Sequence, residues 1–240
     1  MFKLEIHVLN EYNVLEGIGN LRIVERDIGA KLEKEKTIIY KCSECGEEVT
    51  LVLPQIINEE KTAEVEDMSL FKWTCTSCKH VWKLLYPCMY VNEDKKILVW
   101  FVNNLSQSDQ LEAQLEEEFR EKTKGFTKRF CNTLEEFSEK VRVLESGLDD
   151  RTIELLKIMT FARLHVSMPS LESIYYYRRD ELGNYEFTIF SEEGPNGIAL
   201  PFTMYQEIAQ IVQNEIPELK DQFYRIDLDW AGKQIVGFQK

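Results

Sequence analysis

Two pairs of cysteines constrain this chain more than any other feature of its sequence. Cys42 and Cys45 form one C-x-x-C pair, Cys75 and Cys78 form a second, and 29 residues lie between them. A two-residue gap allows a tight turn to direct both sulfurs of a pair to one point, and Gly46, directly after the first pair, tolerates a positive φ. Two such turns on neighbouring hairpins complete a tetrahedral site of four sulfurs, which suits Zn²⁺ best and iron second. The spacing therefore predicts a metal site with these four cysteines as ligands.

Two other interpretations of the cysteine pairs remain open. A redox-active C-x-x-C normally occurs once, at the start of a helix after a strand, so two copies at this spacing disfavour it. The spacing and Trp73, two positions before Cys75, are also similar to rubredoxin, an iron-containing electron carrier. The chain lacks rubredoxin's proline within the second pair and its glycine after that pair. The colour of the protein distinguishes the two metals, because ferric iron on four thiolates is red and zinc is colourless.

Net charge and hydropathy limit the partners of the chain. Its 240 residues carry a formal net charge of −13, which opposes a large nucleic-acid surface, because binding of phosphates relies on Lys and Arg. The N-terminus alternates apolar and polar residues instead of resembling a secretory signal, and the longest apolar run, Ile97–Val102, is far too short for a membrane span. We expect a cytoplasmic protein without membrane contacts, in which six cysteines stay reduced or bind metal.

Signatures of the common enzyme classes are missing from the sequence. It contains no H-E-x-x-H, G-x-x-x-x-G-K-[ST], G-x-G-x-x-G or G-x-S-x-G motif. It has only three histidines, and a closed site of four cysteines leaves no open position at which a metal activates water. We therefore expect no catalytic residues. An enzyme whose site is assembled from residues outside these motifs is the alternative hypothesis.

Hydrophobic periodicity predicts a first half built mainly from strands. The first 36 residues are expected to form an added hairpin or a loosely attached extension, with strands at Phe2–Val8 and 21–24. A polar, acidic and exposed connection is expected over Ile56–Asp67, between the two cysteine hairpins. The continuous run Ile97–Val102 predicts a central strand buried on both faces. The arms of the two hairpins are predicted at residues 37–41, 49–53, 70–74 and 81–86.

Helices and strands alternate in the predicted second half. Thr133 and Glu136 match a capping box at the start of one helix, and Asp149 is placed to cap the next. Thr203 and Gln206 match a second capping box. The expected helices are at about 108–122, from 134, from 150 and at 203–213, and the expected strands are at 127–131, 174–178, 185–190, 198–202 and 225–229.

Several polar residues have a simpler explanation than a functional site. His80 lies two residues after Cys78 and is expected at the surface or beside the ligands. Cys88 and Cys131 fall in strand-like segments and should behave as small apolar residues. Asp149-Asp150 is explained by an N-cap with a negatively charged first turn.

Two further groups of charged residues are expected to face solvent. Asp227 and Asp229 fall on one face of the predicted last strand. A separate run, Tyr175–Arg179, places aromatic rings beside cations, as stacking on bases requires. It is short and isolated in an acidic chain, so nucleic-acid binding is disfavoured. A solvated face is expected for the one other basic cluster, which consists of Lys122, Lys124, Lys128 and Arg129.

Five segments of the chain together form a recognisable pattern: Cys42–Gly46, Leu70–Cys78, Tyr86–Lys96, Leu134–Val141 and Gly147–Lys157. Through these segments, the chain resembles the CpXC-domain family of bacterial and archaeal proteins over residues 39–165. It implies a zinc site on the four cysteines and no particular biochemical activity. The chain departs from the family at its name-giving proline, since Ser43 and Thr76 stand there, and Lys79 replaces the usual glycine of the second turn. Proline stiffens the turn but is not a ligand, so metal binding is not excluded.

These observations predict an α+β protein with zinc-ribbon-like β-hairpins, followed by helices and a C-terminal α+β unit. The expected domains are an extension or hairpin over 1–38, a CpXC-like domain over 39–165 and a C-terminal region over 166–240. A structural Zn²⁺ on Cys42, Cys45, Cys75 and Cys78 is expected to hold the ribbon together. We expect function through contacts with a protein partner, whose identity the sequence does not reveal.

Overall fold

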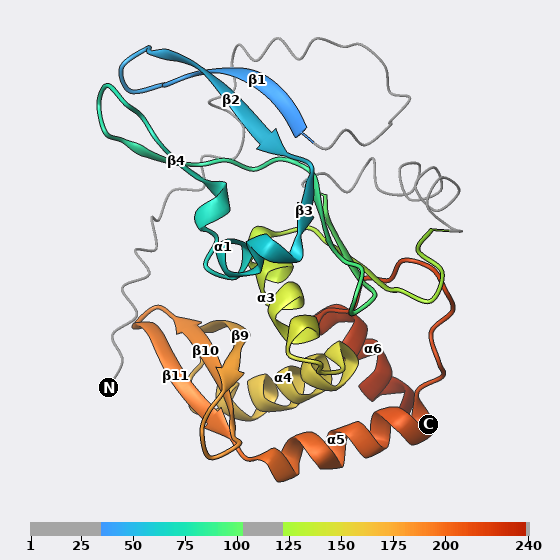
Figure 1. Cartoon of the computed structure of the whole chain (residues 1–240). Helices are drawn as coiled ribbons and strands as arrows, with labels where there is room; N and C mark the ends of the chain where they lie inside the picture. Colours follow the sequence, from blue (N-terminus) through green and yellow to red (C-terminus); the bar gives the residue numbers. More distant parts are fainter. Residues whose placement is uncertain (1–34, 103–121, 239–240) are drawn as a thin grey trace.

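The computed structural model describes residues 35–102 and 122–238 and has the expected α+β architecture (Figure 1). The predicted N-terminal strands, and all but the last residue of the predicted helix at 108–122, lie outside the described residues. Among those described, no helix combines the length and the hydropathy needed to cross a bilayer. The elements before the undescribed internal stretch are β1 (Glu35–Lys41), β2 (Glu48–Pro54), β3 (Ile56–Asn58), η1 (Glu59–Lys61), α1 (Thr62–Glu66), η2 (Ser69–Phe71), β4 (Lys72–Thr74), β5 (Val81–Lys83), β6 (Cys88–Asn92) and β7 (Ile97–Phe101).

The elements after that stretch begin with a strand and two helices and end with a second sheet and two more helices. They are β8 (Thr127–Cys131), α3 (Leu134–Glu145), α4 (Asp150–His165), β9 (Leu171–Arg179), β10 (Tyr185–Ser191), β11 (Gly194–Leu200), α5 (Phe202–Glu215) and α6 (Leu228–Phe238).

Two antiparallel hairpins form one end of the molecule, as the sequence predicts. β1 pairs with β2, and β4 pairs with β5, in two separate two-stranded sheets. Figure 1 shows both hairpins extending away from helices α4, α5 and α6. In the β1–β2 hairpin, side chains alternate between the two faces: Ile38 and Leu51 are partly buried against the core, whereas Ile39 and Val52 are exposed.

A four-stranded sheet lies beneath the hairpins, in the order β3-β6-β7-β8. All five residues of its central strand β7 are buried, which confirms the prediction for Ile97–Val102. Alternate residues of β7 serve two different cores. Val99 and Phe101 pack in the core that includes Phe137 of α3, and Leu98 and Trp100 pack on the opposite face with Phe223.

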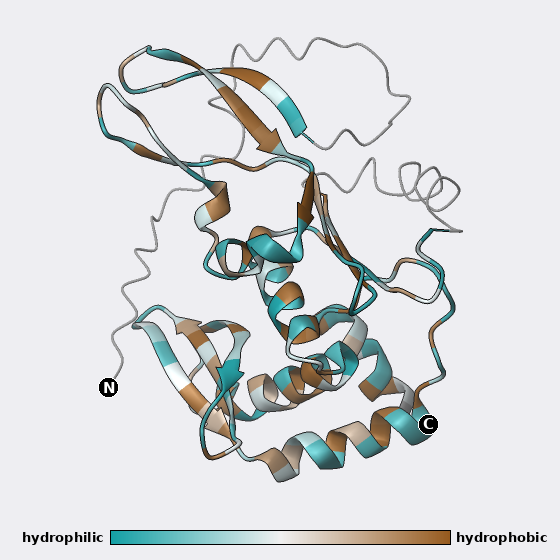
Figure 2. Ribbon diagram, viewed as in Figure 1, coloured by the Kyte–Doolittle hydropathy of each residue, from teal (hydrophilic) through white to brown (hydrophobic). Residues whose placement is uncertain are grey.

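The segment Ile56–Asp67 is not the exposed connection that its polar sequence predicts. Ile56–Asn58 forms β3, a hydrophobic strand that pairs in parallel with β6 (Figure 2), and α1 follows. Ile57 and Val65 are 1% and 0% exposed. Burial of these two side chains against the sheet outweighs the preference of their acidic neighbours for solvent.

Helices α3 and α4 begin close to their predicted positions. The hydroxyl of Thr133 accepts a hydrogen bond from the Glu136 N–H, and the carboxylate of Asp149 accepts one from the Arg151 N–H, so both N-caps are confirmed. The reciprocal half of the predicted capping box differs. The Glu136 carboxylate accepts from the N–H of Asn132, one residue before the N-cap.

The C-terminal sheet is an antiparallel meander, β11-β10-β9, that packs with α4, α5 and α6 around a separate core. Two predictions fail here. Helix α5 begins at Phe202 after Pro201 and lacks a side-chain cap, so Thr203 and Gln206 form no capping box. Residues 225–229 are not a strand. Asp227 accepts a hydrogen bond from the Trp230 N–H at the start of α6, because its carboxylate serves as a helix cap instead.

A buried ion pair connects β8 to α4. Arg129 donates from Nε and Nη2 to the two carboxylate oxygens of Asp150, at 2.7 and 2.9 Å. Arg129 and Asp150 are 6% and 1% exposed, and Lys128 is 4% exposed, so Lys128 and Arg129 do not lie on a solvated face as expected. Asp150 is more than the first-turn charge that its position suggests, because it neutralises a buried guanidinium.

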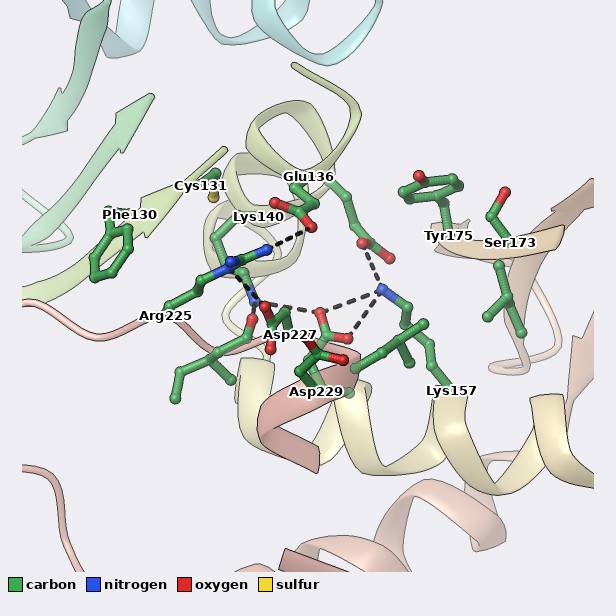
Figure 3. Close-up of a pocket in the computed structure, with 15 residues that line it drawn as sticks. Phe130, Cys131, Glu136, Lys140, Lys157, Ser173, Tyr175, Arg225, Asp227 and Asp229 are labelled. Carbon is green, nitrogen blue, oxygen red and sulfur yellow. Dashed lines mark hydrogen bonds and ion pairs between the residues drawn. The ribbon is translucent and has the colours of Figure 1, made fainter. Parts of the chain in front are cut away.

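Four more buried side chains extend this pair into a network between α3 and α4 (Figure 3). Lys140 Nζ lies 3.1 Å from Asp150 and 3.3 Å from Glu154. Lys157 Nζ lies 3.0 Å from Glu154 and 2.6 Å from Glu139. Lys140 also donates to the main-chain carbonyl of Ile226, and Glu139 accepts from the main-chain N–H of Tyr176, so the network reaches β9 and the segment before α6.

Cations around Asp150 keep its carboxylate ionised. Burial alone would raise its pKa, but Lys140 and Arg129 hold the pKa of Asp150 well below its usual range. The stabilisation from this group is therefore complete above the pKa of an unfolded aspartate, and it is lost as the pH falls toward the folded pKa.

We predict that Asp150→Asn lowers the free energy of unfolding by about 3–5 kcal/mol, because it leaves buried cations without their countercharge. Urea-induced unfolding at neutral pH measures the loss. Glu186→Gln is the control, since Glu186 pairs with the exposed Arg178 at the surface, and it should change stability by at most about 1 kcal/mol. Equal effects of the two substitutions would contradict a supporting role for the buried pair.

Candidate metal centre

The first cysteine turn connects β1 to β2 and folds its backbone around Cys42. The Cys42 N–H donates to the carbonyl of Glu47 at 2.8 Å, and the Gly46 N–H donates to the carbonyl of Cys42 at 2.8 Å. Gly46 has a φ of +75°, as the sequence predicts for the residue after the pair. A side chain at this position would meet no obstacle closer than 3.8 Å, so the backbone angle rather than space favours glycine.

The second cysteine turn connects β4 to β5 and repeats the same hydrogen bonds. The Cys75 N–H donates to the carbonyl of His80 at 2.9 Å, and the Lys79 N–H donates to the carbonyl of Cys75 at 3.0 Å. Lys79, which occupies the position of Gly46, has a φ of +65°. The absence of glycine therefore leaves the turn intact, at a conformational cost of about 1–2 kcal/mol.

The two turns bring their four thiols together, as the spacing predicts. Sγ of Cys42 lies 3.7 Å from Sγ of Cys78, and Sγ of Cys45 lies 3.6 Å from Sγ of Cys75. All four sulfurs lie within 4.8 Å of one another. Metal–sulfur bonds of about 2.3 Å place tetrahedral ligands about 3.8 Å apart, so the donor set fits one four-coordinate ion. These distances do not distinguish zinc from iron, and they are too long for disulfide bonds.

The inner and outer cysteines of each pair differ in exposure. Cys42 and Cys75 are 1% and 0% exposed, whereas Cys45 and Cys78 are exposed. Each turn therefore contributes one sulfur from inside the ribbon and one from its surface. This arrangement lets an ion reach the site from solvent and still contact both buried thiols.

An aromatic cluster beside the four sulfurs joins the two hairpins. Trp73 and Trp82 pair across β4 and β5, and the ring of Tyr40 from β1 lies 5.2 Å and 6.3 Å from theirs. The ring of His80 packs 4.4 Å from Trp82 and is exposed, so it matches the expectation of a surface residue beside the site. These rings are a second link between hairpins that share no main-chain hydrogen bonds.

Protonation of the sulfurs depends on their shared surroundings. Burial opposes ionisation of Cys42, but the N–H groups of Cys45 and Glu44 lower its pKa to about 6. The His80 N–H favours the thiolate of Cys78, yet burial and the neighbouring sulfurs raise its pKa to about 12. Four thiolates this close repel one another, so only a bound cation keeps all four ionised near neutral pH.

The other predicted residues lie outside the group of four sulfurs. Cys88 and Cys131 are buried in β6 and β8, where burial raises the pKa of both thiols, so they behave as apolar residues. Asp149 and Asp227 are helix caps.

Sequence reasoning missed the buried charges of α3 and α4. Their one local signal is the spacing of Glu154 and Lys157, three residues apart, which is typical of an exposed ion pair on a helix surface.

One of three comparisons with known proteins finds a match. No curated protein and no solved structure matches the chain. The family model described as CpXC protein matches residues 40–157, a range that contains both cysteine turns, the four-stranded sheet, α3 and the first half of α4. Residues 40–157, just under half of the 240 residues, therefore form a CpXC domain.

Proposed function

We propose that this chain is a cytoplasmic, non-catalytic protein in which Zn²⁺ on Cys42, Cys45, Cys75 and Cys78 fastens two hairpins into one ribbon. The observation that supports this function is the convergence of four thiols from two separate sheets. Zn²⁺ would be held by four thiolates and would supply cross-linking rather than Lewis-acid chemistry, because no coordination position is left for a substrate.

The hairpins need such a fastening. A two-stranded hairpin alone is marginally stable in water, and β1–β2 and β4–β5 are both two-stranded. Metal binding contributes about 10–16 kcal/mol in zinc-finger peptides, far more than the aromatic contacts of Tyr40 supply. The ion would therefore decide whether this end of the molecule is ordered.

The ordered ribbon presents apolar side chains that suit a protein partner. Ile39 is 70% exposed and Val52 is 56% exposed, and both lie on the outer face of the β1–β2 hairpin. Val81 and Leu85, on and just after β5, are also exposed. We call these four residues the ribbon patch. Exposed apolar groups on a metal-organised surface are typical of interaction sites.

We predict about one zinc per purified chain and a colourless protein. Cys75→Ser should reduce the zinc content to near zero, because three thiolates bind far more weakly than four. Hydrogen exchange should then accelerate in residues 35–54 and 72–83 and stay slow in α4. Elemental analysis and exchange mass spectrometry measure the two effects.

Cys131→Ala is the matched control for this experiment, because Cys131 is a buried thiol outside the four-sulfur group. It should keep its zinc and the slow exchange of the ribbon. A metal-free but fully protected Cys75→Ser ribbon would contradict the structural role. A red protein with visible thiolate-to-iron absorption would favour the electron carrier over the zinc ribbon.

Acid should release the metal. Ligand thiols must lose their protons to bind, so apparent zinc affinity falls as the pH falls, and each ligand that must be deprotonated steepens the dependence. We predict no release at pH 8 and progressive release below about pH 6, followed with a chromogenic chelator. Release that is independent of pH would exclude thiolate ligands.

The partner hypothesis has its own test. Ile39→Lys together with Val52→Lys should abolish partner capture while zinc content is unchanged, because charges replace the apolar patch. Affinity purification with quantitative mass spectrometry compares this variant with a control that carries Leu182→Lys, an exposed apolar residue between β9 and β10. Proteins retained equally by both variants are not partners of the ribbon patch.

A further inference from the structure

Trp82 carries a buried hydrogen-bond donor that has no acceptor of ordinary geometry. It is the central residue of β5, where it pairs with Trp73 of β4. Its ring is half-buried, but its indole nitrogen Nε1 is buried and has no hydrogen-bond partner among the described residues. Most buried donors in proteins are satisfied, because a buried N–H has given up its bonds to water. A donor of this kind beside a candidate metal centre points to an acceptor within that centre.

The sulfur of Cys42 is within reach of this donor. The Trp82 ring packs 4.4 Å from His80 of the second turn and 6.3 Å from Tyr40, two residues before Cys42. Burial opposes ionisation of Cys42, but two main-chain N–H groups of the first turn and the side chain of Trp82 lower its pKa by hydrogen bonding. Cys42 is 1% exposed, so water does not compete for its sulfur. The donor and the acceptor are therefore both enclosed, and they come from different hairpins.

The charge on the sulfur decides the strength of this contact. A neutral thiol is a weak acceptor, so an N–H that faces one is poorly satisfied. A thiolate is a strong acceptor, because hydrogen bonds to ionised groups are about twice as strong as those between neutral groups. Cysteine binds a metal ion as the thiolate. The contact between Trp82 and Cys42 is therefore strongest when Cys42 is a metal ligand.

We propose that the indole N–H of Trp82 donates to the thiolate of Cys42 and holds this ligand in place for the metal ion. The inference rests on the metal function proposed above and adds a positioning residue to it. Trp82 belongs to the β4–β5 hairpin and Cys42 to the turn after β1, and no main-chain hydrogen bond joins these two sheets within the described residues. The bond therefore couples the docking of the hairpins to retention of the ion.

A ring that only packs is the alternative role for Trp82. Packing depends on the shape of the indole and on its contacts with Tyr40 and His80, and it does not need the N–H. Trp100 provides the comparison, because its Nε1 is also buried without a partner among the described residues. Trp100 packs with Phe223 on the four-stranded sheet, away from the four ligand cysteines. A test must therefore separate the N–H of Trp82 from its ring.

Cadmium NMR of the full, ¹⁵N-labelled chain tests the bond itself. ¹¹³Cd²⁺ replaces zinc on thiolates, and its nuclear spin couples to a nearby N–H proton through the metal–sulfur bond and the hydrogen bond. We expect a resolved coupling from the metal to the indole proton of Trp82 and none to that of Trp100. Absence of this coupling at Trp82 in a chain that has bound ¹¹³Cd²⁺ overturns the proposal. A chain that binds no metal contradicts the zinc function itself, so the two failures are distinguishable.

Replacement of Trp82 by 3-benzothienylalanine tests the consequence for the ion. This analogue keeps the shape of the indole ring and has a sulfur atom in place of the N–H, so the packing is preserved. Release of Zn²⁺ to a chromogenic chelator, in the acid range where the parent chain loses its ion, should be about tenfold faster, as is typical when a partner of a metal ligand is removed. The same replacement at Trp73, the neighbour of Trp82 across the hairpin, is the matched control and should leave the rate unchanged. An unchanged rate for the Trp82 analogue, or equal acceleration at both positions, would refute the role of the N–H.

Discussion

The carboxylate of Asp150 is buried in the interior, where an unpaired charge is costly. The surrounding elements supply the cations that keep it ionised. Arg129 comes from the edge of the four-stranded sheet and Lys140 from α3, while Asp150 begins α4. Removal of any one of these three side chains would leave another buried charge without its partner. Charges buried in this way specify a single docking geometry for the sheet and the two helices, because a shift of a few ångströms would leave carboxylate and cation apart.

The metal centre follows the opposite principle. Its four sulfurs come from two short turns that have the same pattern of main-chain hydrogen bonds. Each turn consists of residues that are neighbours in the sequence. The network of α3 and α4 instead collects residues from four elements and from the segment before α6. One polar centre is therefore modular, and the other is a property of the whole tertiary fold. The family match contains the four cysteines and all the charged side chains of the network, and it ends before the main-chain partners of the network at Tyr176 and Ile226.

What the sequence predicts well is what depends on neighbours along the chain. The cysteine turns, strands β7 and β8 and the caps at Thr133 and Asp149 follow from local spacing and side-chain chemistry. Long-range contacts account for the errors. Pairing with β6 makes Ile56–Asn58, at the start of the polar stretch, a strand. The alternating residues at 225–229 resemble a strand in sequence, but Asp227 caps α6. The buried charges were missed because a lysine on an amphipathic helix looks the same whether it meets water or a carboxylate from another element.

The order of these centres along the chain has a consequence for biosynthesis. The last sulfur of the metal centre belongs to Cys78, and the ribbon ends at Lys83. The network, by contrast, is incomplete until Ile226 has been added. During synthesis, the ribbon could therefore fold and take up a metal ion before the charged residues of the network have been added, since domains fold from the N-terminal side. In the nascent chain, Arg129 and Lys140 must then stay in contact with water until the segment around Ile226 has been synthesised and covers them.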